Sequence, residues 1–215
     1  GHDFIIGDNG KLESLDVQPV LKVATIQTTD TNVATGGADN IQGNAGDDVV
    51  LGGLAGDVIN GNAGNDAILG DNGTLSAVLY NGTGLLSVAT IASEVSGTLG
   101  GGDTITGDEG NDVILGGLGA DTVNGNLGHD LIVGDNGSFN GVTVQPNWVL
   151  SSVQTTDTTD VTGGVDVLHG DDGDDLILGG LDGDAITGDN GNDAIVGDNG
   201  SISTIVYDAA GLQSI

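Results

Sequence analysis

A nine-residue repeat of glycine and aspartate constrains the fold of this chain more than any other feature. In the stretch GGLAGDVINGNAGNDAILGDNG, from Gly52 to Gly73, an aspartate returns every nine residues and an aliphatic residue follows two positions later. The general pattern is G-[GND]-x-[GA]-x-D-x-[VIL]-x. Its aspartates are Asp39, Asp48, Asp57, Asp66, Asp103, Asp112, Asp121, Asp130, Asp166, Asp175, Asp184 and Asp193, and Asp3 ends an earlier block. So short a period predicts stacked turns, in which each repeat contacts its neighbours.

A longer period contains the short one. The string GDNG begins at Gly7, Gly70, Gly134 and Gly197, so one unit spans 63 or 64 residues. Inserts without the nine-residue repeat separate the blocks, and each insert reads as strand, turn and strand, with Asn81-Gly82 as a hairpin signal. The expected segments are the end of a preceding β-roll block (1–10), hairpin inserts (11–35, 74–99 and 138–162), β-roll blocks (36–73, 100–137 and 163–200) and the start of a further hairpin (201–215). Because the chain begins and ends within motifs, we expect it to belong to a longer array.

The charge balance excludes several partners. The chain has two basic residues against 32 acidic ones, and its formal net charge is -30. Nucleic acid and anionic membrane surfaces are therefore not expected partners, and no apolar run is long enough for a transmembrane helix. Such acidic chains are often disordered, but the regular aliphatic positions favour a fold. Since cysteine is absent, we expect a cation rather than disulfides to stabilise that fold.

The repeat resembles the repeats-in-toxin (RTX) nonapeptide GGxGxDxUx, in which calcium binds the turns of a parallel β-roll. The resemblance covers the three repeat blocks, somewhat over half of the chain. It implies an all-β fold in which right-handed parallel β-roll (β-solenoid) blocks alternate with β-hairpins. Six residues form a turn and three a short strand, so turns two repeats apart stack and Asp39 lies one rung from Asp57. Calcium takes six to eight oxygens, whereas zinc and copper favour His or Cys, which the repeat consensus lacks.

The resemblance assigns the metal ligands residue by residue. They are the repeat aspartates named above, with two fully paired sites expected in each block. Backbone carbonyls complete the sites, at turn residues such as Gly37, Gly46, Gly64, Gly101, Gly110, Gly119, Gly128, Gly164, Gly173 and Gly191. The GDNG turns have no aspartate at position six, so we expect them to form weaker sites or caps. Their own aspartates are Asp71, Asp135 and Asp198. Ala55 and Asp182 depart from the pattern at its glycine slot.

Residues beside the ligands are expected to be less important. Asp47 occupies the variable fifth position and should be a solvated turn charge, so its replacement should matter less than that of Asp57. His2 and His129 read as exposed turn residues, and His169 lies on a strand; none has a recognisable partner. Trp148 is expected to pack against a sheet.

The outward positions of the roll predict two different sheets. Position eight should face the interior while positions seven and nine face outward. In alternate repeats the outward positions are apolar, as at Leu51 and Leu69, and such a stripe is an aggregation hazard if it is bare. We expect the hairpins to cover it through apolar residues such as Leu75, Val78, Leu86 and Val88. The alternative is that neighbouring chains pair through this face into a fibre or array.

The sequence favours a structural rather than a catalytic protein. It has three Glu, no Cys, no Arg and no serine in a nucleophile elbow. We expect an extracellular or cell-surface, calcium-stabilised structural segment of a large bacterial surface protein, an adhesin stalk or filament. The alternative is the calcium-binding C-terminal module of a secreted enzyme such as a protease, lipase or epimerase. The resemblance also implies export of the unfolded chain by type I secretion.

Overall fold

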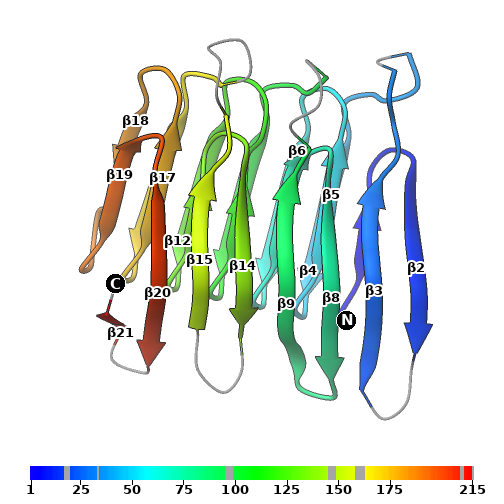
Figure 1. Cartoon of the computed structure of the whole chain (residues 1–215), viewed down its shortest axis with the longest axis horizontal. Coiled ribbons are helices and arrows are strands. Elements are labelled where there is room, and N and C mark those ends of the chain that lie inside the picture. Colours follow the sequence, from blue (N-terminus) through cyan, green and yellow to red (C-terminus); the bar gives the residue numbers. More distant parts are fainter. Residues whose placement is uncertain are drawn as a thin grey trace.

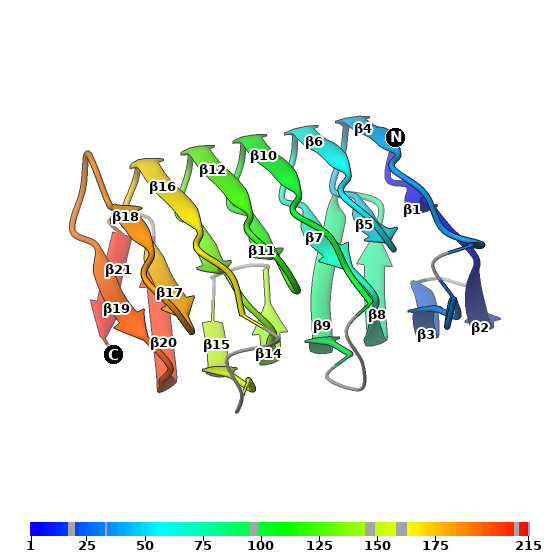
Figure 2. The ribbon, with the colours of Figure 1, turned by 90° about the horizontal axis from the view of Figure 1, so that it is seen from above.

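The chain folds into three stacked β-sheets. The computed structural model describes residues 1–16, 20–32, 34–94, 99–144, 149–157, 163–208 and 211–214, and no helix occurs among them. In Figure 2 the three sheets lie as layers, each running the length of the molecule from the N-terminal to the C-terminal end. The described residues contain no helix of the length and apolarity needed to cross a membrane.

Two parallel sheets form the roll that the nine-residue repeat predicts. The middle sheet has seven strands, in the order β1 (Phe4–Ile6), β5 (Val49–Gly53), β7 (Ala67–Asp71), β11 (Val113–Leu115), β13 (Leu131–Val133), β17 (Leu176–Gly180) and β19 (Ala194–Asp198). The polar sheet has six, in the order β18 (Ala185–Thr187), β16 (Val167–Asp172), β12 (Thr122–Leu127), β10 (Thr104–Glu109), β6 (Val58–Ala63) and β4 (Asn40–Ala45). Successive repeats alternate between the two sheets.

The inserts do not interrupt the roll. β7 pairs in parallel with β11 across the second insert, with Ile68 opposite Ile114, and β1 pairs in the same way with β5 across the first. The repeat blocks therefore form one continuous roll rather than separate bodies. The sequence predicts blocks that alternate with hairpins along the chain, and the structure adds that the blocks join edge to edge in space.

The inserts form a third, antiparallel sheet that is also continuous. This hairpin sheet has eight strands, in the order β2 (Gly10–Asp16), β3 (Leu21–Thr28), β8 (Gly73–Asn81), β9 (Gly84–Ser93), β14 (Gly137–Thr143), β15 (Val149–Thr155), β20 (Ser201–Asp208) and β21 (Gly211–Ser214). Each hairpin pairs with the next, as β9 does with β14. In Figure 1 this sheet lies in front of the roll.

Two separate apolar cores join the layers. Position eight of the repeats fills the inside of the roll, where residues such as Val50 and Ile59 are fully buried, and only at the last described repeat is it exposed, at Ile195. The apolar outer face of the middle sheet packs against the hairpin sheet in a second core, which includes Leu51, Leu69 and Leu75. The predicted covering of this face by the hairpins is confirmed.

The second core differs in one detail from the expectation. Leu85 is buried in it, while Leu86 is only half-buried, because the register of β9 turns Leu85 toward the roll. The middle sheet is covered within a single chain, with Leu51 at 0% and Leu69 at 1% exposure. The alternative raised above, pairing of chains through this face, would need these side chains exposed, whereas the hairpin sheet buries both of them.

Candidate metal centre

The turns of the roll depend on backbone conformations that favour glycine. Gly64 has a φ of +140°, and a methyl carbon built on it would lie 2.5 Å from the carbonyl carbon of Gly46 on the neighbouring rung. Ala55 and Asp182, the two departures from the glycine slot, nevertheless adopt φ values of +73° and +71°. Glycine therefore lets successive turns stack in close contact, and the two departures retain a left-handed backbone.

The repeat aspartates line both edges of the roll in two files. Each file follows the rungs across the inserts without a gap. The first file is Asp39, Asp57, Asp103, Asp121, Asp166 and Asp184, and the second is Asp3, Asp48, Asp66, Asp112, Asp130, Asp175 and Asp193. In each file one carboxylate oxygen, Oδ1, accepts the backbone N–H of the preceding aspartate, as Asp66 Oδ1 does from Asp48 at 2.7 Å. These bonds aim the carboxylates along each file, from Asp57 onward in the first and from Asp48 onward in the second.

The second oxygen of these carboxylates has no partner. Oδ2 is buried without a hydrogen bond at eleven file members: Asp39, Asp48, Asp57, Asp66, Asp103, Asp112, Asp121, Asp130, Asp166, Asp175 and Asp184. A buried unpaired carboxylate oxygen is strongly unfavourable. A repeated row of them indicates missing positive charge.

Glycine at position one creates the space beside each orphaned oxygen. A methyl carbon built on Gly43 would lie 2.6 Å from Asp48 Oδ2 and 2.5 Å from the carbonyl oxygen of Gly61. The carboxylate oxygen and the carbonyl oxygen thus converge on a space that any side chain would fill. These position-one carbonyls were not among the expected ligands, although the glycine that begins GDNG and GNAG marks the position.

The predicted carbonyl donors at position four lie elsewhere in the turn. They stack in two columns, in which each carbonyl lies against the α-carbon of the next glycine. One column holds Gly46, Gly64, Gly110, Gly128, Gly173 and Gly191, and the other holds Gly101, Gly119 and Gly164. Gly37 has no carbonyl stacked against it, since nothing lies within 4 Å of a methyl carbon built there, and its N–H donates to Asp8 Oδ1 at 3.1 Å.

Burial makes these carboxylates resist ionisation in the absence of metal. Desolvation raises the pKa of Asp57 to about 6, of Asp66 to about 7 and of Asp103 to about 8. For Asp112, desolvation and the neighbouring carboxylates of Asp130 and Asp66 raise the pKa well above its ordinary value. The files therefore need either protons or a cation.

The aspartate pairs extend beyond single blocks. Two pairs were expected within each block, but Asp57 also bonds to Asp103, and Asp66 to Asp112, across a 46-residue separation. The paired geometry therefore continues from one block to the next. The sequence could not show this. Which repeat of one block stacks on which repeat of the next depends on where the chain re-enters the roll after the hairpin.

The GDNG aspartates have a different environment. Asp71 accepts backbone N–H groups from Gly101 and Leu118, and Asp135 accepts them from Gly164 and Leu181. Asp8 does the same with Gly37 and Leu54, whereas Asp198 is exposed at the last turn. Both oxygens of Asp8, Asp71 and Asp135 accept backbone N–H groups, so their geometry fits the expected caps better than weaker metal sites.

Asp47 contradicts the expectation of a solvated charge. It is 6% exposed, and its carboxylate accepts the N–H of Asn65 at 2.9 Å and of Leu85 at 2.6 Å. The fifth position forms its own ladder, in which each backbone N–H donates to the preceding side chain: His2, Asp47, Asn65, Asn111, His129, Asp174 and Asn192. Stacking of the turns, which the sequence predicts, brings these variable residues together.

The histidines also have partners, contrary to the expectation. His2 and His129 accept N–H groups of Asp47 and Asp174 through Nδ1, at 2.7 and 2.8 Å. His169 Nδ1 lies 2.7 Å from the hydroxyl of Thr187 on the next rung. Trp148 lies outside the described residues.

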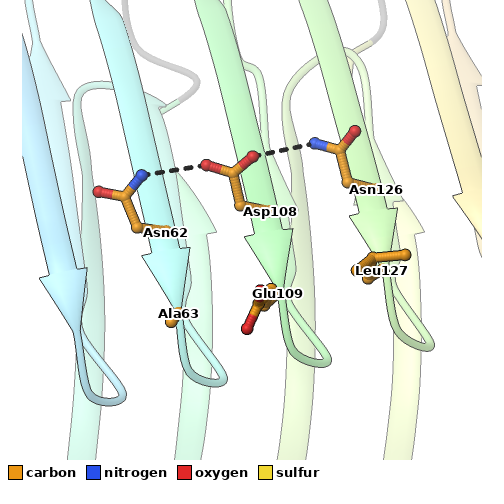
Figure 3. A pocket seen from close by; sticks show the side chains of 6 residues that line it. All are labelled: Asn62, Ala63, Asp108, Glu109, Asn126 and Leu127. Atoms are coloured by element: carbon orange, nitrogen blue, oxygen red, sulfur yellow. Dashed lines mark hydrogen bonds between the residues drawn. The ribbon is translucent and has the colours of Figure 1, made fainter.

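A further acidic group lies in a hollow at the C-terminal ends of β6, β10 and β12 in the polar sheet. Figure 3 shows Asp108 between Asn62 and Asn126, whose amide groups donate to its two oxygens at 3.0 and 3.4 Å. Ala63, Glu109 and Leu127 complete the lining. Because amides satisfy this carboxylate, the hollow lacks the orphaned oxygens that distinguish the files.

The donor set of the files fits calcium. No group of three or more His, Cys, Asp or Glu side chains gathers around one point in the described part of the chain, so side chains alone cannot form a cage. Each point along a file offers carboxylates from neighbouring rungs, about 4.8 Å apart, together with backbone carbonyls. These all-oxygen, irregular surroundings suit Ca²⁺ better than Mg²⁺, which demands tighter octahedral geometry.

Comparison with known proteins agrees with this chemistry. A family model described as the RTX calcium-binding nonapeptide repeat matches four stretches, residues 28–55, 51–74, 98–137 and 169–201, which together span more than half of the chain. No curated protein and no solved structure matches the chain. The chain belongs to the RTX calcium-binding nonapeptide repeat family, whose repeats bind several Ca²⁺ ions.

Proposed function

We propose that this chain is an extracellular, calcium-stabilised structural segment of a large bacterial surface protein, such as an adhesin stalk or filament. The observation that supports the proposal is the pair of unbroken aspartate files, with orphaned buried oxygens along the whole roll. Continuous files suit a body that must keep one shape over its length. For the second candidate, a calcium-binding module beside a secreted enzyme, we expect fewer and simpler rolls.

We further propose that the ligands are the carboxylates of neighbouring file members with position-one carbonyls. Segments 36–73, 100–137 and 163–200, with hairpins 11–35, 74–99, 138–162 and 201–215, are then repeating parts of one body rather than separately folding domains. Without metal the files repel and lose solvation, which favours an open chain. Extracellular calcium modules bind with dissociation constants of roughly 10⁻⁴ to 10⁻³ M, so the chain folds after it reaches millimolar calcium.

The first prediction is that calcium is required for folding. We expect the circular dichroism of the metal-free chain at pH 7.5 to change from coil to β as calcium is added, with a steep midpoint because stacked sites share one roll. Equimolar magnesium serves as the control and should leave the coil spectrum. A β spectrum that persists in excess chelator at this pH would falsify the proposal.

The two candidate functions differ in what the same polypeptide carries. Many further 63-residue units in the parent gene favour the stalk. A catalytic domain joined to these few units favours the enzyme module.

A further inference from the structure

Asp47 lies where the roll and a hairpin meet. Its Oδ1 accepts the N–H of Asn65, which directly precedes Asp66, while Asp47 itself directly precedes Asp48. Its Oδ2 accepts the N–H of Leu85, the second residue of β9 at the tip of the hairpin β8–β9. One carboxylate therefore joins the backbone beside two neighbouring members of the second file to the hairpin tip.

The same arrangement recurs 127 residues later. Asp174 accepts the N–H of Asn192 at 2.8 Å and of Leu212 at 2.9 Å, and it lies beside Asp175 as Asn192 lies beside Asp193. A methyl carbon on Gly211, at φ +101°, would collide with Asp174 Oδ2, so the hairpin approaches the carboxylate through glycine. Its counterpart Gly84 also has a positive φ, +134°.

Aromatic packing accompanies each of these two contacts. Tyr80 of β8 lies with its ring centroid 5.8 Å from that of His2, and Tyr207 of β20 stacks on His129 at 5.5 Å. Each histidine accepts the N–H of the aspartate concerned. The whole set of histidine, aspartate, tyrosine and glycine therefore repeats with a period of two units.

The unit between them uses a different residue at this position. Asn111 occupies the ladder there, and its single side-chain oxygen accepts the N–H of His129. An amide can continue the ladder with that oxygen, but its other terminal atom is an NH₂ donor rather than a second acceptor oxygen for a hairpin. The aspartates are therefore specific to alternate hairpins.

We propose that Asp47 and Asp174 are positioning residues that couple calcium binding in the second file to docking of the hairpin tips at Leu85 and Leu212. The inference rests on the proposed calcium function. A cation held by Asp48 and Asp66 would fix the spacing of the two rungs, and this spacing would hold the Asp47 carboxylate toward Leu85. Coupling is reciprocal, so a docked tip also favours calcium at this edge.

The test replaces one carboxylate oxygen in the full chain. Asp47→Asn keeps an oxygen for Asn65 but presents an NH₂ group to the N–H of Leu85. Hydrogen–deuterium exchange in saturating calcium should rise about tenfold or more at residues 84–86, as expected for loss of a bond to a charged group. Residues 211–213 should remain protected, and Asp174→Asn should give the reverse pattern.

Calcium titration tests the coupling itself. The calcium midpoint of Asp47→Asn should rise severalfold above that of Asp108→Asn, which removes the same charge from the hollow of Figure 3. Unchanged exchange at residues 84–86 would overturn the docking role. Faster exchange with the midpoint of the control would overturn the coupling. Failure of the unaltered chain to bind calcium would instead overturn the proposed function.

Discussion

At the residue scale, turn position decides what an aspartate does in this protein. A sixth-position aspartate has one oxygen bonded to backbone and the other orphaned, as at Asp66. A GDNG aspartate such as Asp71 and a fifth-position aspartate such as Asp47 have both oxygens on backbone N–H groups. The first environment leaves one oxygen for a cation, while in the other two backbone N–H groups occupy both oxygens, although burial still raises the pKa of Asp71 to about 9.

These environments predict opposite pH dependences with and without calcium. Desolvation raises the folded-state pKa of Asp57 to about 6 and of Asp103 to about 8, above an ordinary value of about 3.9. The metal-free fold therefore binds more protons than the open chain between about pH 4 and 8, and its stability falls as pH rises through this window. Calcium affinity should rise over the same window, since the ion replaces those protons.

Protein freed of metal on a chelating resin gives the measurement. Circular dichroism should report more β structure at pH 4.5 than at pH 8 without calcium, and at pH 8 calcium should restore it. Metal-free protein that is more folded at pH 8 than at pH 4.5 would contradict the assignment of buried, proton-binding carboxylates.

The left-handed turn residues predict a stabilising substitution. Ala55 has a φ of +73°, which costs an L-residue roughly 1 to 2 kcal/mol. Glycine removes this cost but adds entropy to the unfolded chain, so Ala55→Gly should stabilise the calcium-bound fold by about 0.5 to 1 kcal/mol. Ala63→Gly, in strand β6, is the matched control and should destabilise by about 0.5 to 1 kcal/mol. Thermal unfolding that moves both variants in the same direction would argue against strain at Ala55.

At the element scale, strands with similar sequences differ in what covers them. Position seven is Val49 in the middle sheet, which is 0% exposed, and Val58 in the polar sheet, which is 41% exposed. The residues are identical and the turns are alike. Only the hairpin sheet, which packs over the middle sheet, distinguishes them.

This contrast gives a paired prediction. Val49→Thr buries a hydroxyl group in the second core and should destabilise the chain by about 1 to 3 kcal/mol, whereas Val58→Thr at the exposed position should change stability by less than about 0.5 kcal/mol. Chemical denaturation in saturating calcium measures both. Equal effects would mean that the hairpins do not cover the middle sheet in solution.

The elements also explain what the sequence could and could not predict. The nine-residue period predicted the roll, the position-eight residues inside it and the aspartates of both files, because each of these features depends on neighbouring turns. The burial of Asp47, the partners of His2 and His129, and the pairing of Asp57 with Asp103 depend on contacts 18 to 46 residues apart in sequence. A period shows that such turns stack, but the chemistry of a variable position follows only from knowing which residues meet there.

At the scale of the whole molecule, the 63-residue unit has a geometric reason. One unit supplies two strands to each sheet, as β4 and β6, β5 and β7, and β8 and β9 do. Neighbouring strands in any sheet lie about 4.8 Å apart, whether they are parallel or antiparallel. Four nonapeptides and one hairpin therefore advance the three layers by the same distance, and the layers stay aligned over any number of units.

The equal advance of the three layers per unit predicts the length of longer arrays. Small-angle X-ray scattering should be measured on chains of three, five and seven units in saturating calcium. The maximum dimension of the particle should grow by about 10 Å per unit, which is twice the strand spacing. Roll blocks joined by extended inserts of 25 residues would instead grow by up to roughly 80 Å per unit, at about 3.3 Å per residue. Metal-free samples at pH 7.5 should lose the linear relation, because the open chain scales with a power of its length below one. Growth well above 10 Å per unit in calcium would show that the hairpins leave the roll, and the continuous three-layer body would then be wrong.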